Sequence, residues 1–160
     1  MTNSNDVRAF MMRAIELSLE NVRAERGGPF GCVLVKDGEV VAEGTNLVTA
    51  TNDPTAHAEV VAIRAACQKL QCFDLRGCEL YSSCEPCPMW LGAIYWGRID
   101  RVYFGNLAED AAKIGFDDSF IYAELNRPAG ERRIPLVQMM REEAAAAFRA
   151  WVELPGRVRY

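Results

Sequence analysis

A short hairpin followed by alternating strand and helix patterns constrains this fold more than any other feature of the sequence. Two apolar runs, at 30–35 and 40–42, flank Asp37-Gly38, a dipeptide typical of a tight hairpin turn. Helical spacing of apolar residues over 7–22 precedes the hairpin. Beyond it, strand patterns at 79–82, 101–104 and 137–140 alternate with helical patterns at 53–70, 86–97, 108–114 and 142–152. This alternation predicts an α/β fold in which helices cover a layered sheet.

Size and charge narrow the class of protein. The 160 residues suffice for one domain, and 22 acidic against 18 basic residues leave a net charge of -4. An acidic chain of this kind argues against a broad phosphate-binding surface, so a nucleic-acid partner is not expected. No apolar run is long enough to span a membrane, and Met1 to Asp6 lacks an apolar signal core. We therefore expect a cytoplasmic protein whose six cysteines are thiols or metal ligands.

Two clusters of chemically active residues begin predicted helices. The first is His57-Ala58-Glu59, which holds the only histidine of the chain, and the second runs from Cys84 to Trp90. Histidine and cysteine are the ligands that zinc prefers, and a neighbouring carboxylate that is not a ligand can move protons. A helix N-terminus also favours thiolate over thiol and stabilises a developing anion. The two clusters together predict a zinc site with a carboxylate beside it.

Five stretches of the chain carry a resemblance to a known family. They are 27–31, 52–59, 83–89, 91–96 and 115–120. With its His-x-Glu and Pro-Cys motifs, the sequence resembles the bacterial guanine deaminases among the cytidine-deaminase-like zinc deaminases. The resemblance implies a three-layer α/β/α sandwich with a central mixed sheet of about five strands. It also implies one Zn²⁺ per chain, held by His57 and Cys87, and hydrolysis of guanine to xanthine and ammonia with Glu59 as proton shuttle.

The same resemblance implies further roles around a small purine base. Asp118 matches a second proton shuttle near the leaving amine. The implied substrate contacts are Phe30, Asn46, the backbone N–H of Ala58, Trp96 and Tyr160. In these relatives the C-terminal segment crosses to the partner subunit of a homodimer, so residues 1–160 form one domain whose segment at about 142–160 is exchanged.

The sequence departs from the family pattern at Trp90. That position is a cysteine in the family motif, the third protein ligand of zinc, whereas an indole N–H is a donor with no lone pair for a metal. Three interpretations are open at this point. Cys84 supplies the missing thiolate, or zinc binding is weak or absent, or the tryptophan was introduced into an active parent.

Other functions compete with guanine deamination. A tRNA adenosine deaminase shares the fold and the zinc motif, but it needs a basic surface for its polyanionic substrate. Deamination of cytosine or cytidine ranks third, because Asp117-Asp118 favours a purine. A non-catalytic binding protein on the same scaffold is a different class, favoured by Trp90 and opposed by Glu59, Asn46 and Asp118.

Overall fold

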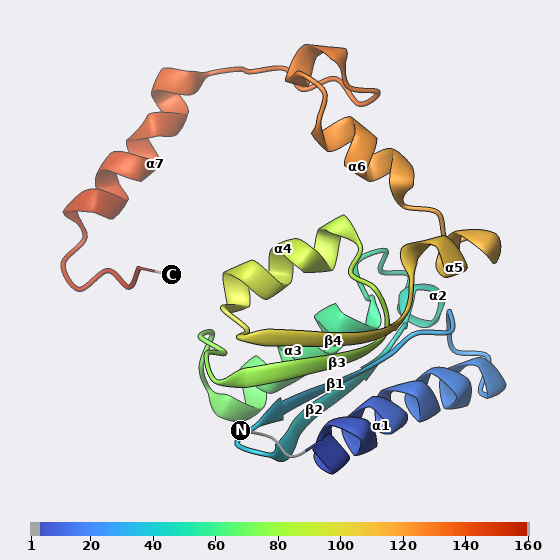
Figure 1. Ribbon diagram of the computed structural model, residues 1–160. Coiled ribbons are helices and arrows are strands. Elements are labelled where there is room, and N and C mark those ends of the chain that lie inside the picture. Colours follow the sequence, from blue (N-terminus) through green and yellow to red (C-terminus); the bar gives the residue numbers. More distant parts are fainter. Residues whose placement is uncertain (1–3, 160) are drawn as a thin grey trace. The chain divides into compact units, whose positions relative to one another are not determined.

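A mixed four-stranded sheet forms the centre of the protein. The computed structural model describes residues 4–159. Its strands are β1 (Gly31–Lys36), β2 (Glu39–Thr45), β3 (Cys78–Cys84) and β4 (Arg101–Asn106), in the order β2-β1-β3-β4 (Figure 1). β1 pairs antiparallel with β2 and β3, and β3 pairs parallel with β4. The sheet is therefore mixed, as expected.

The hairpin is confirmed and the fifth strand is not. Asp37 and Gly38 both have positive φ, 51° and 79°, which is the geometry of the tight turn that the dipeptide predicts. The prediction of a strand at 137–140 is wrong, because that segment has no regular structure and the described residues form four strands. A strand needs a neighbour for its backbone hydrogen bonds, and local sequence does not supply one.

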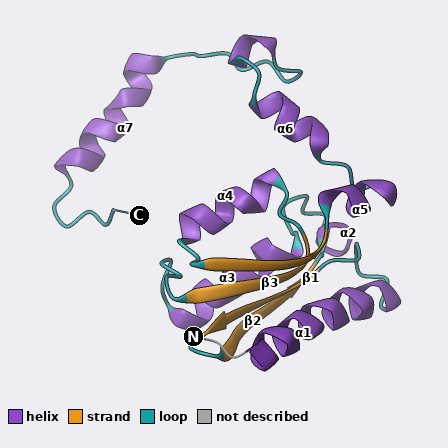
Figure 2. Cartoon of the chain, viewed as in Figure 1, coloured by secondary structure: helices purple, strands orange, loops and turns teal. Residues whose placement is uncertain are grey.

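Helices cover both faces of the sheet. α1 (Ser4–Arg23) packs on one face, while α3 (Ala58–Leu70) and α4 (Pro88–Gly97) lie on the other (Figures 1 and 2). The result is the three-layer α/β/α arrangement that was expected.

Alternation along β1 divides the core into two layers. Val33 and Val35 point toward α1, whereas Cys32 and Leu34 join the cluster beneath α3 and α4. All four side chains are buried, so β1 is covered on both faces.

A glycine on β2 lets α3 lie close to the sheet. A Cβ atom at Gly44 would lie 2.1 Å from the Ala58 carbonyl oxygen and 2.7 Å from the Ala62 nitrogen. Only glycine permits this approach of helix backbone to strand backbone. Because Ala58 begins α3, the contact sets the start of that helix directly over the sheet.

α3 and α4 begin later than the sequence patterns predict. α3 starts at Ala58 rather than near Asp53, because the Asp53 carboxylate accepts hydrogen bonds from the Thr55 N–H at 2.8 Å and the Thr55 hydroxyl at 2.7 Å. The aspartate therefore closes a turn and does not cap the helix. α4 starts at Pro88, with Cys87 as its N-cap, rather than at Pro86. The short helix α2 (Val48–Thr51) lies between β2 and α3.

The remaining elements belong to the C-terminal third of the chain. They are α5 (Ala108–Lys113), α6 (Ser119–Leu125), the 3₁₀ helix η1 (Ala129–Glu131) and α7 (Arg141–Glu153). The chain divides into two compact units, Met1–Asp118 and Ser119–Tyr160. No described residue of the second unit is buried. None of the helices described combines the length and apolar character that crossing a bilayer requires.

Candidate active site

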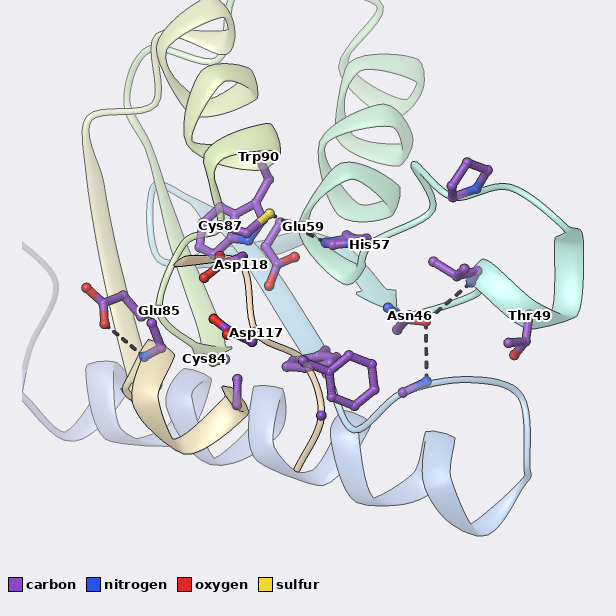
Figure 3. Close-up of a pocket in the computed structure, with 18 residues that line it drawn as sticks. Asn46, Thr49, His57, Glu59, Cys84, Glu85, Cys87, Trp90, Asp117 and Asp118 are labelled. Carbon is purple, nitrogen blue, oxygen red and sulfur yellow. Dashed lines mark hydrogen bonds between the residues drawn. The ribbon is translucent and has the colours of Figure 1, made fainter. Parts of the chain in front are cut away.

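One pocket of about 400 Å³ in the first unit gathers most of the predicted site residues. Its polar lining comes from the ends of several elements and is dominated by Asn46, His57, Glu59, Cys87, Asp117 and Asp118 (Figure 3). Aromatic side chains complete the wall. Phe30 and Phe116 meet edge to face with centroids 5.0 Å apart, and Trp90 lies beside Cys87 (Figure 3). The pocket thus combines flat apolar surfaces with converging acid, amide and imidazole groups.

His57 and Cys87 approach each other from the N-caps of two helices. Both residues have extended backbone, so each side chain leaves its helix end and turns toward the other. The distance from His57 Nδ1 to Cys87 Sγ is 3.6 Å. Two ligands bound tetrahedrally to zinc at typical Zn–N and Zn–S distances lie about 3.6 Å apart. This pair therefore fits two corners of a zinc site.

The electrostatic surroundings of the pair also suit a metal. Burial lowers the pKa of His57, although the charge of Asp118 opposes the shift, so the imidazole is neutral and has a lone pair. Burial raises the pKa of the Cys87 thiol, while the backbone N–H groups of Met89 and Trp90 stabilise its thiolate. Those N–H groups belong to the first turn of α4, where they have no helical acceptor.

A third protein ligand is missing from the described residues. Nowhere within 4–159 do three His, Cys, Asp or Glu side chains gather closely enough to hold a metal ion. The Cys84 sulfur contacts the Leu107 carbonyl oxygen at 3.8 Å, and burial raises its pKa to about 11, which favours the neutral thiol. Trp90 is 2% exposed and lines the pocket with a group that cannot ligate. The donor set thus fits zinc at two positions and is one short of a three-ligand catalytic site.

Glu59 is the buried acid of the pocket. Its side chain is 3% exposed, and Ser82 Oγ donates a hydrogen bond to its Oε1 at 2.5 Å. Burial raises the pKa of Glu59 to about 7, and the bond from Ser82 partly opposes that shift. A carboxyl group with this pKa both accepts and returns protons near neutral pH.

Asn46 is oriented by its surroundings. Its Oδ1 accepts hydrogen bonds from the Gly28 and Val48 N–H groups, each at 3.3 Å. The Asn21 side chain donates to the backbone oxygens of Asn46 at 2.8 Å and Gly28 at 3.0 Å, which fixes this corner from α1. Because Oδ1 is occupied, the Nδ2 group of Asn46 is the part of the amide that can donate to a ligand.

Acidic groups from two further segments close the opposite wall. Glu85 Oε2 accepts a hydrogen bond from the Ala108 N–H at 3.0 Å, which joins the end of β3 to the start of α5. Burial raises the pKa of Asp118, and the charges of Asp117 and Glu85 raise it further. A pocket with several carboxylates favours ligands rich in N–H donors and disfavours phosphate groups.

The structure brings together most of the predicted residues, and two described ones, Ala58 and Trp96, are not part of the pocket lining. Phe30, Asn46, His57, Glu59, Cys87 and Asp118 line one pocket. Ala58 is fully buried at the first position of α3. Trp96 is 68% exposed and is not among the residues that line this pocket, and Tyr160 lies outside the described residues.

Sequence reasoning missed several residues of the wall. They are Thr49, Pro54, Glu85 and Phe116. Phe116 stands within the stretch at 115–120 that carried the family resemblance, and Glu85 stands within 83–89. Their position inside these motifs was therefore the signal that could have identified these two residues.

Comparisons with known proteins agree with this site. Residues 4–106 match the family model described as the cytidine and deoxycytidylate deaminase zinc-binding region. The chain is 54% identical over 151 residues to guanine deaminase from Bacillus subtilis, covering 94% of this chain and 97% of that one. The X-ray structure of guanine deaminase from Bacillus subtilis superposes with a TM-score of 0.93 and 53% identity over 96% of this chain and 98% of the other.

A structure from a study of tRNA:A34 deaminases is more distant. Its TM-score is 0.63 at 33% identity, covering 80% of this chain and 94% of that chain. The matched range includes His57, Glu59 and Cys87, which line the pocket. The chain therefore belongs to the zinc-dependent cytidine and deoxycytidylate deaminase family.

Proposed function

We propose that this protein catalyses the zinc-dependent hydrolytic deamination of guanine to xanthine and ammonia. The observation that carries the proposal is the convergence of His57, Cys87 and Glu59 in one pocket whose other walls are aromatic and acidic. Similarity to a guanine deaminase extends over nearly the whole length of both chains and supports guanine as the substrate. In the reaction, water oxygen bonds to the amine-bearing carbon, and the C–N bond breaks to release ammonia.

The residues divide the work as follows. Zinc, when bound, supplies Lewis-acid activation of water, and His57 Nδ1 with Cys87 Sγ would hold it. The Glu59 carboxylate takes a proton from the attacking water and delivers it to a ring nitrogen of the purine. Asp118 then carries the second proton of the added water toward the departing amine, from the opposite wall of the pocket. Burial raises the pKa of both acids, to about 7 for Glu59, which favours return of the proton by each group.

The purine is bound by amide, backbone and aromatic groups. The Nδ2 group of Asn46 donates to a ring or carbonyl acceptor of the base, since its Oδ1 is already occupied. The N–H of Ala58, in the first turn of α3, is a second donor. Phe30, with Phe116 packed against its edge, provides a flat surface for the ring.

Trp90 stands, in this proposal, at the position of the family's third cysteine ligand. Its location in the first turn of α4, three residues after Cys87 and in the pocket wall, supports this assignment. With two protein donors the metal is held more weakly than in a three-ligand site. We therefore expect low zinc occupancy and slow turnover for this sequence.

The C-terminal region points to a second copy of the chain. We propose that residues 1–160 form one functional domain whose segment at about 142–160 is exchanged between two subunits. The described residues of the second unit carry large exposed apolar side chains, among them Phe148, Trp151 and Val152. Apolar side chains at this density need a covering surface. In such a dimer, Trp96 and Tyr160 would reach the substrate at the subunit boundary.

A cytosolic location fits the thiol chemistry. All six cysteines are free, including the pocket residues Cys84 and Cys87, and free thiols of this number suit a reducing compartment.

The decisive experiment measures zinc per chain and guanine turnover together, on this sequence and on Trp90→Cys. Conversion of guanine to xanthine, followed by absorbance, should be detectable here and faster in the variant as zinc content rises. A tRNA anticodon stem-loop serves as the competing substrate. Deamination of that RNA without guanine turnover would replace the proposal with RNA editing. If Trp90→Cys binds one zinc per chain but deaminates neither guanine nor the RNA, the remaining interpretation is a non-catalytic binding protein.

A further inference from the structure

We propose that Ser82 is a positioning residue for Glu59, holding one oxygen of its carboxylate so that the other serves the substrate. This inference rests on the proposed function, in which Glu59 is the proton carrier. Ser82 itself does not touch the substrate, because its side chain is fully buried on β3 beneath the pocket.

The hydrogen bonds around Ser82 determine which group receives its hydroxyl proton. Ser82 Oγ donates to Glu59 Oε1 at 2.5 Å, a short contact of the kind expected for a hydroxyl donating to a carboxylate. The same Oγ accepts from the Cys84 N–H at 3.4 Å. A backbone N–H can only donate, and a hydroxyl has one proton, so that proton goes to Glu59.

The consequence falls on the second carboxylate oxygen. Ser82 engages Oε1, and the backbone N–H of Glu59 itself also hydrogen-bonds the carboxylate. Because Ser82 is the side chain that holds Oε1, we assign proton exchange with a substrate in the pocket to Oε2. Without the bond from Ser82, the carboxylate has more freedom about its terminal torsion, which is broad and roughly two-fold. Ser82 therefore reduces the number of orientations from which Glu59 must begin the reaction.

The neighbouring residues of this cross-strand row on β1 and β2 offer no comparable hydrogen-bond donor for the Glu59 carboxylate. Ser82 lies in one cross-strand row with Cys32 and Gly44, where Cys32 pairs with both neighbours. Gly44 has no side chain, and the fully buried Cys32 thiol is at most a weak donor. A hydroxyl in a buried row costs free energy unless it is hydrogen-bonded, and here its acceptor is the acid of the pocket.

The next residue on β3 supplies a matched control. Ser83 is also buried, but its Oγ accepts a hydrogen bond from the Gly31 N–H at 3.0 Å and its side chain points to the other face of the sheet. Removing the Ser83 hydroxyl removes its hydrogen bond from Gly31, whereas removing the Ser82 hydroxyl removes its bond to Glu59 and the longer bond from Cys84. Only the Ser82 hydroxyl contacts Glu59.

The test compares Ser82→Ala, Ser82→Thr and Ser83→Ala for guanine turnover, in the present chain and in Trp90→Cys. For Ser82→Ala we expect kcat to fall about 10–100-fold, the range for partners of active-site groups, with KM within about twofold and zinc per chain unchanged. Ser82→Thr retains the hydroxyl and should recover most of kcat. Ser83→Ala should leave kcat within about twofold. An unchanged kcat in Ser82→Ala, or an equal loss in Ser83→Ala, would overturn the inference.

A stability cycle separates this inference from the proposed function. Thermal midpoints are measured for Ser82→Ala, Glu59→Ala and the double variant, without substrate. If Ser82 holds Glu59, Ser82→Ala should lower Tm much less when Glu59 is already alanine, because the hydroxyl has lost its acceptor. Additive Tm shifts contradict the positioning role. Absence of guanine turnover in every variant would defeat the proposed function, and the cycle would still decide whether Ser82 holds Glu59.

Discussion

The two helices that meet at the pocket present different halves of one site. The start of α3 carries His57 and Glu59, our proposed metal donor and proton carrier, and Ser82 of β3 donates a hydrogen bond to Glu59. The start of α4 carries Cys87, the second proposed donor, and Trp90, which lines the pocket without a group that can bind a metal. In the proposed site, the α3 half thus combines a metal donor with an acid, whereas the α4 half offers one donor and a bulky indole.

The contrast arises from how each half is packed. Trp90 is nearly fully buried and belongs to the core cluster beneath α3 and α4. A large indole in that place buries apolar surface, which stabilises the metal-free fold. Glu59 gains nothing comparable, because its buried carboxyl is costly to the fold. Its presence is therefore better explained by chemistry than by stability.

The largest expected effect comes from removing the acid of the α3 half. Glu59→Gln keeps the size and the acceptor for Ser82 but cannot carry a proton, so guanine turnover should fall at least about 10³-fold. The measurement is kcat in the Trp90→Cys background, where zinc loading is highest. Zinc per chain should stay the same, since Glu59 is not a ligand. Turnover within tenfold of the parent would show that another group carries the proton.

The next largest effect is expected from adding a zinc donor at the start of α4. Trp90→Cys places a third donor, a second thiolate, in the first turn of α4 and should raise zinc affinity by at least about 10–100-fold, measured by competition with a chelator. Trp90→Ser is the matched control, because it opens the same space without a thiolate. Equal affinity in the two variants would mean that the bulk of the indole, and not the missing donor, weakens the site.

A third comparison concerns how closely each helix is held. Gly44→Ala drives a Cβ into the Ala58 carbonyl oxygen, at 2.1 Å in the present geometry, so α3 must move away from the sheet. We expect a loss of about 2–3 kcal/mol in the free energy of unfolding, measured by urea denaturation. Gly92→Ala, within α4, meets no atom within 4 Å and should be neutral or more stable by up to about 1 kcal/mol. Similar losses in both variants would refute the distinction between the helices.

Local patterns predicted the layers of the fold but not every element boundary. The hairpin was predictable because two residues, Asp37 and Gly38, set its backbone geometry. The start of α3 was not, because Asp53 before a proline is typical both of a helix cap and of the turn that it actually forms with Thr55. The strand expected at 137–140 depended on a neighbour in space, which no local pattern encodes.

The site shows the same division. His57, Glu59 and Cys87 were predictable because each stands in a short motif at a helix start. The contact from Ser82 was not, because it joins residues 23 positions apart through the register of the sheet. Motifs identify the groups that react, while the groups that orient them depend on packing.

The smallest expected effect is a pH dependence of stability at the turn that leads into α3. The hydroxyl and N–H of Thr55 lower the pKa of Asp53 below its ordinary value, so this carboxylate stabilises the fold above its unfolded pKa of about 3.9 and loses that contribution as pH falls through the lower folded value. Asp53→Asn keeps an acceptor for Thr55 but not the charge. Its Tm should therefore lie about 1–2 °C below that of the parent at pH 6, with the gap closing toward pH 3. A gap that stays constant across this range would mean that the charge of Asp53 contributes nothing to the turn that leads into His57.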